Sequence, residues 1–288
     1  MIPRAFEYVR PDSLSEAIRL LVDGGEEAKL LSGGHSLLPM MKLRLASPSK
    51  LIDVSELTDL RGITIDANEV VIGAATTHAE LEHHVELNGV LPMFATVGHQ
   101  IADPTVRNRG TLGGALAHAD PSADWPAAML ALDAKLDVMG AKGTRSIAAD
   151  SFFKGLFETA LESDEIIVRV RVPVVPDRRV AYRKFRHPAS GYAVVGVAVV
   201  LALQASQCTG GRIAVTGFAD HAYRAKHAEE MLAGYAGQPA QTEQLLDLAF
   251  SEVTPLEDRF VDADYRIQLG RTMLRRALAD AMSTDGCH

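Results

Sequence analysis

Two short glycine-containing segments carry the groups that could bind an anion. The first, Ser32-Gly33-Gly34-His35-Ser36, follows a mostly apolar run at 28–31 that predicts a buried strand. Paired glycines lack Cβ atoms, so backbone N–H groups in such a turn can face a phosphate, and the serine hydroxyls can donate as well. By itself, a Gly-Gly turn after a strand is more often only a turn.

The second segment, Thr111-Leu112-Gly113-Gly114-Ala115, repeats this chemistry with a hydroxyl and paired glycines. A diphosphate has two phosphoryl groups, so two such loops converging in one domain could hold it from both sides, with Gly33 and Gly114 leaving space for it. Neither segment has the GxGxxG spacing, and the chain has no GxxxxGK[ST] motif. The residues therefore predict a nucleotide site that is neither of the Rossmann nor of the P-loop type.

The two segments resemble the AGGHS and TIGG loops of the FAD-binding medium subunits of molybdenum hydroxylases such as aerobic carbon monoxide dehydrogenase. The resemblance covers essentially the whole chain and includes residues 37–44 and 101–104. Three positions depart from the family pattern: Ser32 replaces alanine, Leu112 replaces isoleucine, and Ala115 stands where many members have asparagine. Ala115 removes a possible polar contact with the flavin.

The resemblance implies an α+β fold with a two-part FAD-binding domain of the PCMH/vanillyl-alcohol-oxidase type. A small α+β domain with a three-stranded sheet and three helices would follow it. The implied cofactor is a non-covalent FAD, whose diphosphate region would lie against the two loops. Asp124 matches an acidic residue beside the flavin's polar chain, Lys184 a lysine at the carbonyl end of the ring, and Tyr192 an aromatic near the ring.

The predicted cofactor-binding residues are Ser32, Gly33, Gly34, His35, Ser36, Ile101, Thr111, Leu112, Gly113, Gly114, Ala115, Asp124, Ile166, Lys184 and Tyr192. From the residues alone, Lys184 could instead be an exposed strand lysine, and Tyr192 a core residue.

The implied function is electron transfer. A molybdenum-cofactor large subunit would oxidise the substrate, an iron–sulfur small subunit would relay electrons, and the FAD of this subunit would pass them to an acceptor. No residue of this chain would then need to attack a substrate, and the sequence indicates no activated nucleophile. Cys208 and Cys287 cannot supply the ligands of an iron–sulfur cluster, so [2Fe-2S] clusters would belong to a partner. The family expectation is a dimer of heterotrimers. A self-contained FAD oxidase and a nucleotide-binding regulatory module remain as alternatives.

Two groups of polar residues suggest a metal site. His78, His83 and His84 have no further partner at ligand spacing, so we interpret them as part of a solvated helix face. His118 and Asp120 lie near Asp124, but the resemblance assigns Asp124 to the flavin. We therefore predict no metal site in this chain.

Composition narrows the function classes. The chain has 288 residues, 47% of them hydrophobic, which suits two modest packed domains. Its net charge of −8 argues against general nucleic-acid binding. No apolar run approaches the roughly 18 residues of a membrane helix, and the N-terminus has no signal-peptide pattern, so we expect a cytoplasmic protein.

Local patterns predict the elements that position these residues. Thr77-His78-Ala79-Glu80 is a capping box that starts a helix. Alternation over 165–172 predicts a strand with Val168, Val170 and Val172 facing inward. The proline-containing segment 173–179 predicts a boundary between domains 1–176 and 177–288. A hairpin is predicted to pair 63–65 with 70–72, and a second pair of short strands is predicted at 135–139 and 145–148. Other predicted strands are 51–54, 180–185, 192–203 and 212–217, with C-terminal helices at 225–233, 242–253 and 264–282.

Overall fold

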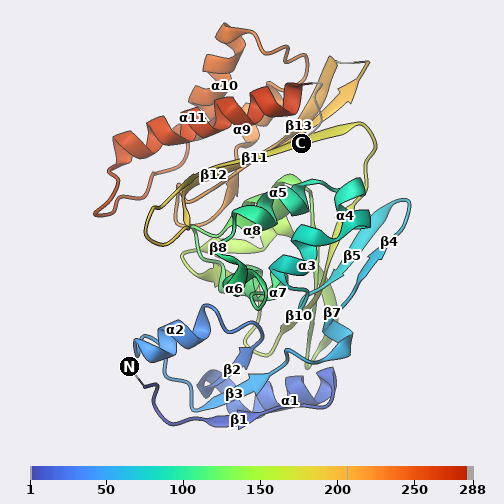
Figure 1. The fold of residues 1–288 in the computed structure, drawn as a ribbon, viewed down its shortest axis with the longest axis vertical. Helices are drawn as coiled ribbons and strands as arrows, with labels where there is room; N and C mark the ends of the chain where they lie inside the picture. Colours follow the sequence, from blue (N-terminus) through green and yellow to red (C-terminus); the bar gives the residue numbers. More distant parts are fainter. Residues whose placement is uncertain (1, 206, 284–288) are drawn as a thin grey trace.

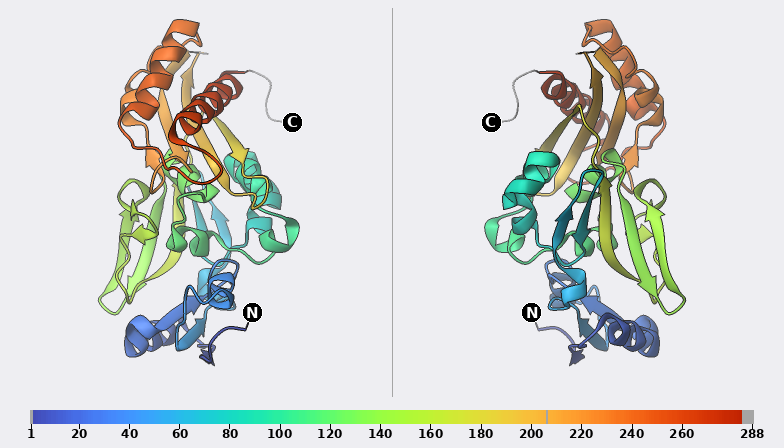
Figure 2. Two further views of the ribbon diagram at one scale, coloured as in Figure 1. Left: turned by 90° about the vertical axis from the view of Figure 1, so that its left-hand side faces the viewer. Right: turned by 90° about the vertical axis from the view of Figure 1, so that its right-hand side faces the viewer.

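Three groups of elements follow one another along the long axis of the molecule (Figure 1, Figure 2). The computed structural model describes residues 2–205 and 207–283. The N-terminal lobe contains β1 (Glu7–Val9), α1 (Leu14–Gly24), β2 (Ala28–Leu31), α2 (Leu37–Lys42) and β3 (Lys50–Asp53). Its strands form a parallel sheet in the order β1-β3-β2, and the apolar face of α1 packs in the core beneath it.

The middle part is built on an antiparallel sheet in the order β4-β5-β10-β6-β7. Its strands are β4 (Ile63–Ile65), β5 (Glu69–Gly73), β6 (Lys135–Gly140), β7 (Gly143–Ala148) and β10 (Ile166–Pro173). Its helices are α3 (His78–His83), α4 (Val85–Val90), α5 (Met93–Gln100), α6 (Pro104–Arg107), α7 (Leu112–His118) and α8 (Asp124–Ala131). A small hairpin joins β8 (Phe153–Gly155) to β9 (Glu158–Thr159). The pairings β4–β5 and β6–β7 and the Thr77–Glu80 capping box are as predicted.

Strand β10 connects two hydrophobic cores. Val168, Val170 and Val172 are all buried, as predicted, but they do not share one face. A bulge between Ile167 and Arg169 interrupts the alternation, because the extra residue shifts the side-chain direction. Val168 therefore packs in the core of the N-terminal lobe, whereas Val170 and Val172 pack in the core of the middle part.

The C-terminal part is an antiparallel sheet in the order β11-β12-β13-β14 with three helices. The strands are β11 (Arg178–Arg186), β12 (Ala193–Gln204), β13 (Gln207–Thr216) and β14 (Tyr223–Arg224), and the helices are α9 (Lys226–Glu230), α10 (Pro239–Ser251) and α11 (Ala263–Met282). The predicted three-stranded sheet is corrected to four strands. Two residues are too few to show the period-2 alternation by which a strand is recognised, so β14 had no sequence signal.

The two faces of this C-terminal sheet contact different parts of the molecule. One face packs against α11, and α8 of the middle part packs against β12 and β13. Tyr182 and Ala198 accordingly belong to the core of the middle part. Within residues 2–205 and 207–283, no helix combines the length and the apolar composition needed to cross a membrane.

Candidate functional site

A cleft of about 900 Å³ is lined by both glycine loops. This volume lies near the upper end of the roughly 300–1,000 Å³ that is usual for small-molecule sites. All predicted cofactor-binding residues line the cleft except Leu112 and Lys184. Leu112 is buried in the core of the middle part, and Lys184 lies behind the cleft wall with 1% of its side chain exposed. The interpretation of Lys184 as an exposed strand lysine is therefore wrong.

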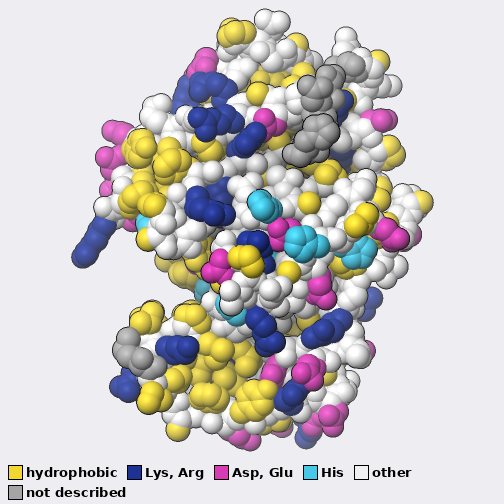
Figure 3. Space-filling model, viewed as in Figure 1, with side chains coloured by type: hydrophobic (Ala, Val, Ile, Leu, Met, Phe, Trp, Pro, Cys, Tyr) yellow, Lys and Arg dark blue, Asp and Glu magenta, His cyan; other side chains and the backbone are white. Residues whose placement is uncertain are grey.

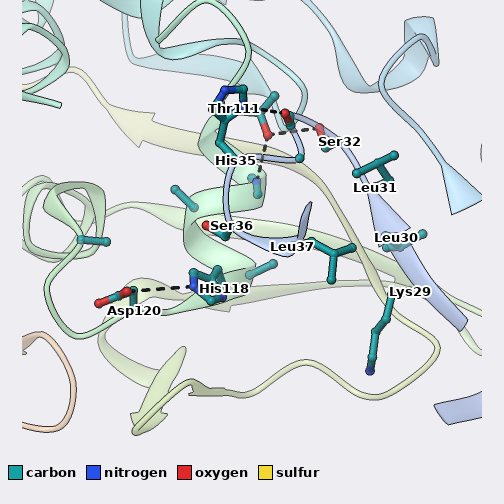
Figure 4. Close-up of a pocket in the computed structure, with 18 of the residues that line it drawn as sticks. Lys29, Leu30, Leu31, Ser32, His35, Ser36, Leu37, Thr111, His118 and Asp120 are labelled. Carbon is teal, nitrogen blue, oxygen red and sulfur yellow. Dashed lines mark hydrogen bonds and ion pairs between the residues drawn. The ribbon is translucent and has the colours of Figure 1, made fainter. Parts of the chain in front are cut away.

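The two glycine loops touch each other directly. The hydroxyls of Ser32 and Thr111 are hydrogen-bonded at 3.1 Å (Figure 4). A Cβ atom at Gly33 would lie 2.2 Å from the carbonyl oxygen of Arg109 and 2.7 Å from the Cα of Gly110. The space next to Gly33 is thus filled by the backbone of Arg109 and Gly110, directly before the second loop, and not by a ligand as the sequence suggested. Gly33 is needed so that the two backbones can approach.

The backbone N–H groups of the second loop are used within the protein. Leu112 donates to Thr76 at 3.0 Å, and Gly113 donates to Ala74 at 2.8 Å. Thr111 caps α7, since its Oγ1 accepts from the N–H of Gly114 at 3.2 Å. This loop therefore acts mainly as a support, which differs from the expectation of two equivalent anion-binding turns.

The first loop differs in this respect. Within the described part of the chain, the N–H groups of residues 33–36 have no protein acceptor. Gly34 adopts φ +74°, a left-handed conformation that suits glycine. The Nδ1 of His35 is hydrogen-bonded to the carbonyl of Gly33 at 2.8 Å, which closes the turn. These N–H groups are available to an anion in the cleft.

His78 contacts the residue that leads into the second loop, because its backbone N–H donates to the carbonyl of Gly110 at 2.9 Å. It is buried, and its Nδ1 accepts a hydrogen bond from Trp125 Nε1 at 3.0 Å. Burial lowers the pKa of His78 to about 4, so the ring is neutral at physiological pH. The interpretation of all three histidines as a solvated helix face is therefore wrong for His78. His83 is exposed, and His84 caps α4 by accepting from Leu87 at 3.2 Å.

The buried, neutral His78 predicts that the folded chain loses stability as the pH falls. Between about pH 6.5 and pH 4, unfolded His78 binds a proton and folded His78 does not, so stability falls as the pH falls. His78→Asn keeps an acceptor for Trp125 but does not titrate. Between pH 7.5 and 4.5, we expect the wild type to lose about 2 to 3 kcal/mol more unfolding free energy than the variant. Urea unfolding of both proteins across this pH range measures the difference. Parallel plots of unfolding free energy against pH would contradict the prediction.

Asp124 is the charged residue most deeply placed in the cleft wall. It begins α8, and its carboxylate accepts from Lys184 Nζ at 2.9 Å and from the Tyr182 hydroxyl at 2.5 Å. Burial raises the pKa of Asp124, and Lys184 and Tyr182 partly offset that rise. Tyr182 was not predicted. Because side chains two positions apart share a strand face, its spacing from Lys184 was an available signal.

Other residues of the cleft were not among the predicted cofactor-binding residues. Leu30, Phe157 and His118 line the cleft, and the ring of His118 contacts that of Phe157 with centroids 5.1 Å apart. Figure 4 shows His118 beside Asp120 below the first loop. These residues come from three separate segments, so only the tertiary fold brings them together.

Comparisons with known proteins agree with this arrangement. Residues 4–175 match the family model described as the FAD binding domain in molybdopterin dehydrogenase, and residues 180–281 match the CO dehydrogenase flavoprotein C-terminal domain. The carbon monoxide dehydrogenase medium chain of Hydrogenophaga pseudoflava is 41% identical over 279 residues, covering 96% of this chain and 97% of that protein. The nicotine 6-hydroxylase medium subunit of Paenarthrobacter nicotinovorans is 36% identical over 277 residues, with 96% and 97% covered.

A solved structure shows the same fold. The carbon monoxide dehydrogenase from Hydrogenophaga pseudoflava that lacks the Mo-pyranopterin moiety contains a chain that matches with a TM-score of 0.95 at 42% identity, covering 98% of both chains. The family models and the relatives thus match both halves of this sequence. The chain belongs to the family of FAD-binding medium subunits of molybdenum hydroxylases and is an oxidoreductase subunit.

Proposed function

We propose that this chain holds FAD in the cleft and passes electrons from the iron–sulfur clusters of a partner subunit to an external acceptor. The observation that carries the proposal is the first loop, whose N–H groups at residues 33–36 have no acceptor within the described part of the chain. These residues line a cleft of about 900 Å³, and a diphosphate would supply the acceptors that their N–H groups lack. The residues present therefore fit the cofactor.

Each part of the cleft suits a different part of FAD. Residues 32–36 would bind the diphosphate, and residues 111–115 would hold the first loop in place. Ile101, Ile166 and Tyr192 provide apolar surface for the flat rings, and Asp124 is an acceptor for hydroxyl groups. Lys184 lies behind Asp124, so we propose that it acts on the flavin as a nearby positive charge. When bound, FAD takes up electrons and passes them on.

The cofactor is expected to be non-covalent. The purified chain should carry, or take up on reconstitution, one FAD per chain. Acid or heat should release the yellow chromophore into the supernatant, where its absorbance measures the stoichiometry. Flavin that stays with the precipitated protein, or no uptake at all, would contradict the proposal.

We propose as partners an iron–sulfur small subunit and a molybdenum-cofactor large subunit, arranged as a dimer of heterotrimers in the cytoplasm. Relatives are named medium chain and medium subunit, and two cysteines cannot ligate a cluster. Hydrophobic side chains gather over the N-terminal part in Figure 3, and the exposed ones in that lobe include Leu43 and Leu45. Exposed apolar patches often mark protein contacts.

Anaerobic reduction separates this proposal from a self-contained FAD oxidase. With candidate substrates such as carbon monoxide and nicotine, which the names of the relatives suggest, any bleaching of the flavin should require the partner subunits. Rapid bleaching of the isolated chain would favour the oxidase. Because the proposal puts the substrate site in a partner, we assign no substrate to this chain.

We also propose that the chain has two domains, 1–176 and 177–288. In support, the matched family ranges end at 175 and begin again at 180, and β10 ends at Pro173 before β11 begins at Arg178. Limited proteolysis should cut first between 174 and 178 in a protein that otherwise stays folded.

A further inference from the structure

The turn that follows α5 forms part of the cleft wall and has an unusual backbone. Ile101 and Ala102 both line the cleft, and Ala102 adopts φ +41°. This left-handed conformation is unfavourable for a residue with a Cβ atom. Such a conformation persists only where the surrounding structure holds it. The left-handed conformation at Ala102 must therefore be stabilised by contacts of this turn with neighbouring side chains.

Three successive carbonyl groups in this turn accept hydrogen bonds from cationic side chains. Gln100 accepts from Lys184 Nζ at 3.1 Å and from Arg186 Nη2 at 2.6 Å. Ile101 and Ala102 both accept from Arg107 Nη1, at 3.0 and 3.5 Å. Arg107 is thus the side chain bound to the two carbonyls nearest the strained position.

Arg107 is itself fixed by a carboxylate on a neighbouring helix. Its Nε lies 2.7 Å from Glu82 Oε2, and the two side chains are only 12% and 7% exposed. Glu82 Oε1 is hydrogen-bonded to His99 Nδ1 at 2.9 Å. Burial opposes ionisation of Glu82, but the hydrogen bond from His99 and the charge of Arg107 outweigh it and lower the pKa of Glu82. The pair is therefore charged at neutral pH and ties α3 to α6, which lie side by side in Figure 1.

We propose that Arg107, held by Glu82, is a positioning residue for the FAD site. Of the described residues in this helix, Val106 lines the cleft and Arg107 does not, so Arg107 acts through the backbone of Ile101 and Ala102. The hydrogen bonds from Arg107 stabilise the left-handed conformation of Ala102 and so keep this turn next to the cofactor. The proposal rests on the proposed function, namely that FAD occupies this cleft.

The test measures FAD dissociation constants for the full-length chain after removal of flavin. Arg107→Met should weaken FAD binding about tenfold, which is the scale of the lost backbone restraint. Ala102→Gly removes the penalty on a left-handed turn, so the double variant Arg107→Met/Ala102→Gly should recover most of the affinity. A purely structural role of Arg107 in joining α3 to α6 would leave the double variant as weak as Arg107→Met.

Arg271→Met is the matched control. Arg271 is also a partly buried arginine paired with carboxylates, Glu243 and Asp247, but it lies on α11 of the C-terminal part. It should bind FAD like the wild type. If Arg107→Met fails to fold, Arg107→Lys tests the same point, because one ammonium cannot replace a guanidinium that contacts Glu82 and two carbonyls at once. Wild-type affinity in a folded Arg107 variant, or no rescue by Ala102→Gly, overturns the proposal, whereas a wild type without FAD affinity overturns the proposed function.

Discussion

Gly33→Ala is expected to weaken FAD binding by roughly 5- to 150-fold, the factor that corresponds to an overpacking cost of about 1–3 kcal/mol. The added Cβ would lie 2.2 Å from the carbonyl oxygen of Arg109, and both atoms belong to or adjoin the backbone, so one loop must move. That movement separates Ser32 from Thr111 and turns the free N–H groups away from the cleft. Equilibrium titration of the flavin-free protein with FAD measures the loss.

Two further alanine variants make this result specific. Gly89 lies in α4 and has no atom within 4 Å of the added Cβ, so Gly89→Ala should bind FAD normally. Gly114→Ala meets only the Thr111 hydroxyl, at 2.7 Å, and should lose less affinity than Gly33→Ala. Normal FAD binding by a folded Gly33→Ala protein would show that the contact between the loops does not position the first one.

Lys184→Met is expected to destabilise the folded chain by about 3–5 kcal/mol, since it leaves a buried carboxylate without its cationic partner. Among the residues that the structure describes, Tyr182 would be the only remaining hydrogen-bond donor to the Asp124 carboxylate. The double variant Asp124→Asn/Lys184→Met removes both charges and should recover most of that loss. Urea unfolding of the flavin-free wild type, the single variants Lys184→Met and Asp124→Asn, and the double variant gives the four free energies of this cycle. The fluorescence of the single tryptophan, Trp125, reports unfolding.

The pH dependence of the Lys184→Met variant provides a second readout. Burial already raises the pKa of Asp124, and loss of Lys184 raises that pKa further. A carboxyl group with a raised pKa binds more protons in the folded than in the unfolded state, so its penalty grows as the pH rises above the unfolded value. The variant should therefore be less destabilised at pH 5 than at pH 8. An equal loss at both values, or no recovery in the double variant, would exclude a charged pair.

Much of the fold was predictable because its signals are local. The hairpins β4–β5 and β6–β7, the helix that starts at Thr77 and the long C-terminal helix follow from alternation, turn residues and capping. The bulge in β10 was not predictable, since the shift at Val168 depends on its pairing with β6. The short β14 depends in the same way on β13.

The amino-acid sequence by itself determined that the chain has two glycine loops, that no cluster could be ligated by its cysteines, and that its residues suit an FAD-binding subunit. Only the tertiary structure decided how the two loops divide their roles. Ser32 and Thr111 are 79 positions apart, and no pattern of local spacing encodes their contact. The fold places the backbone of Arg109 against Gly33, buries His78 next to Trp125 and pairs Asp124 with Lys184. These contacts depend on packing between distant segments, whereas propensity, capping and periodicity act over only a few residues.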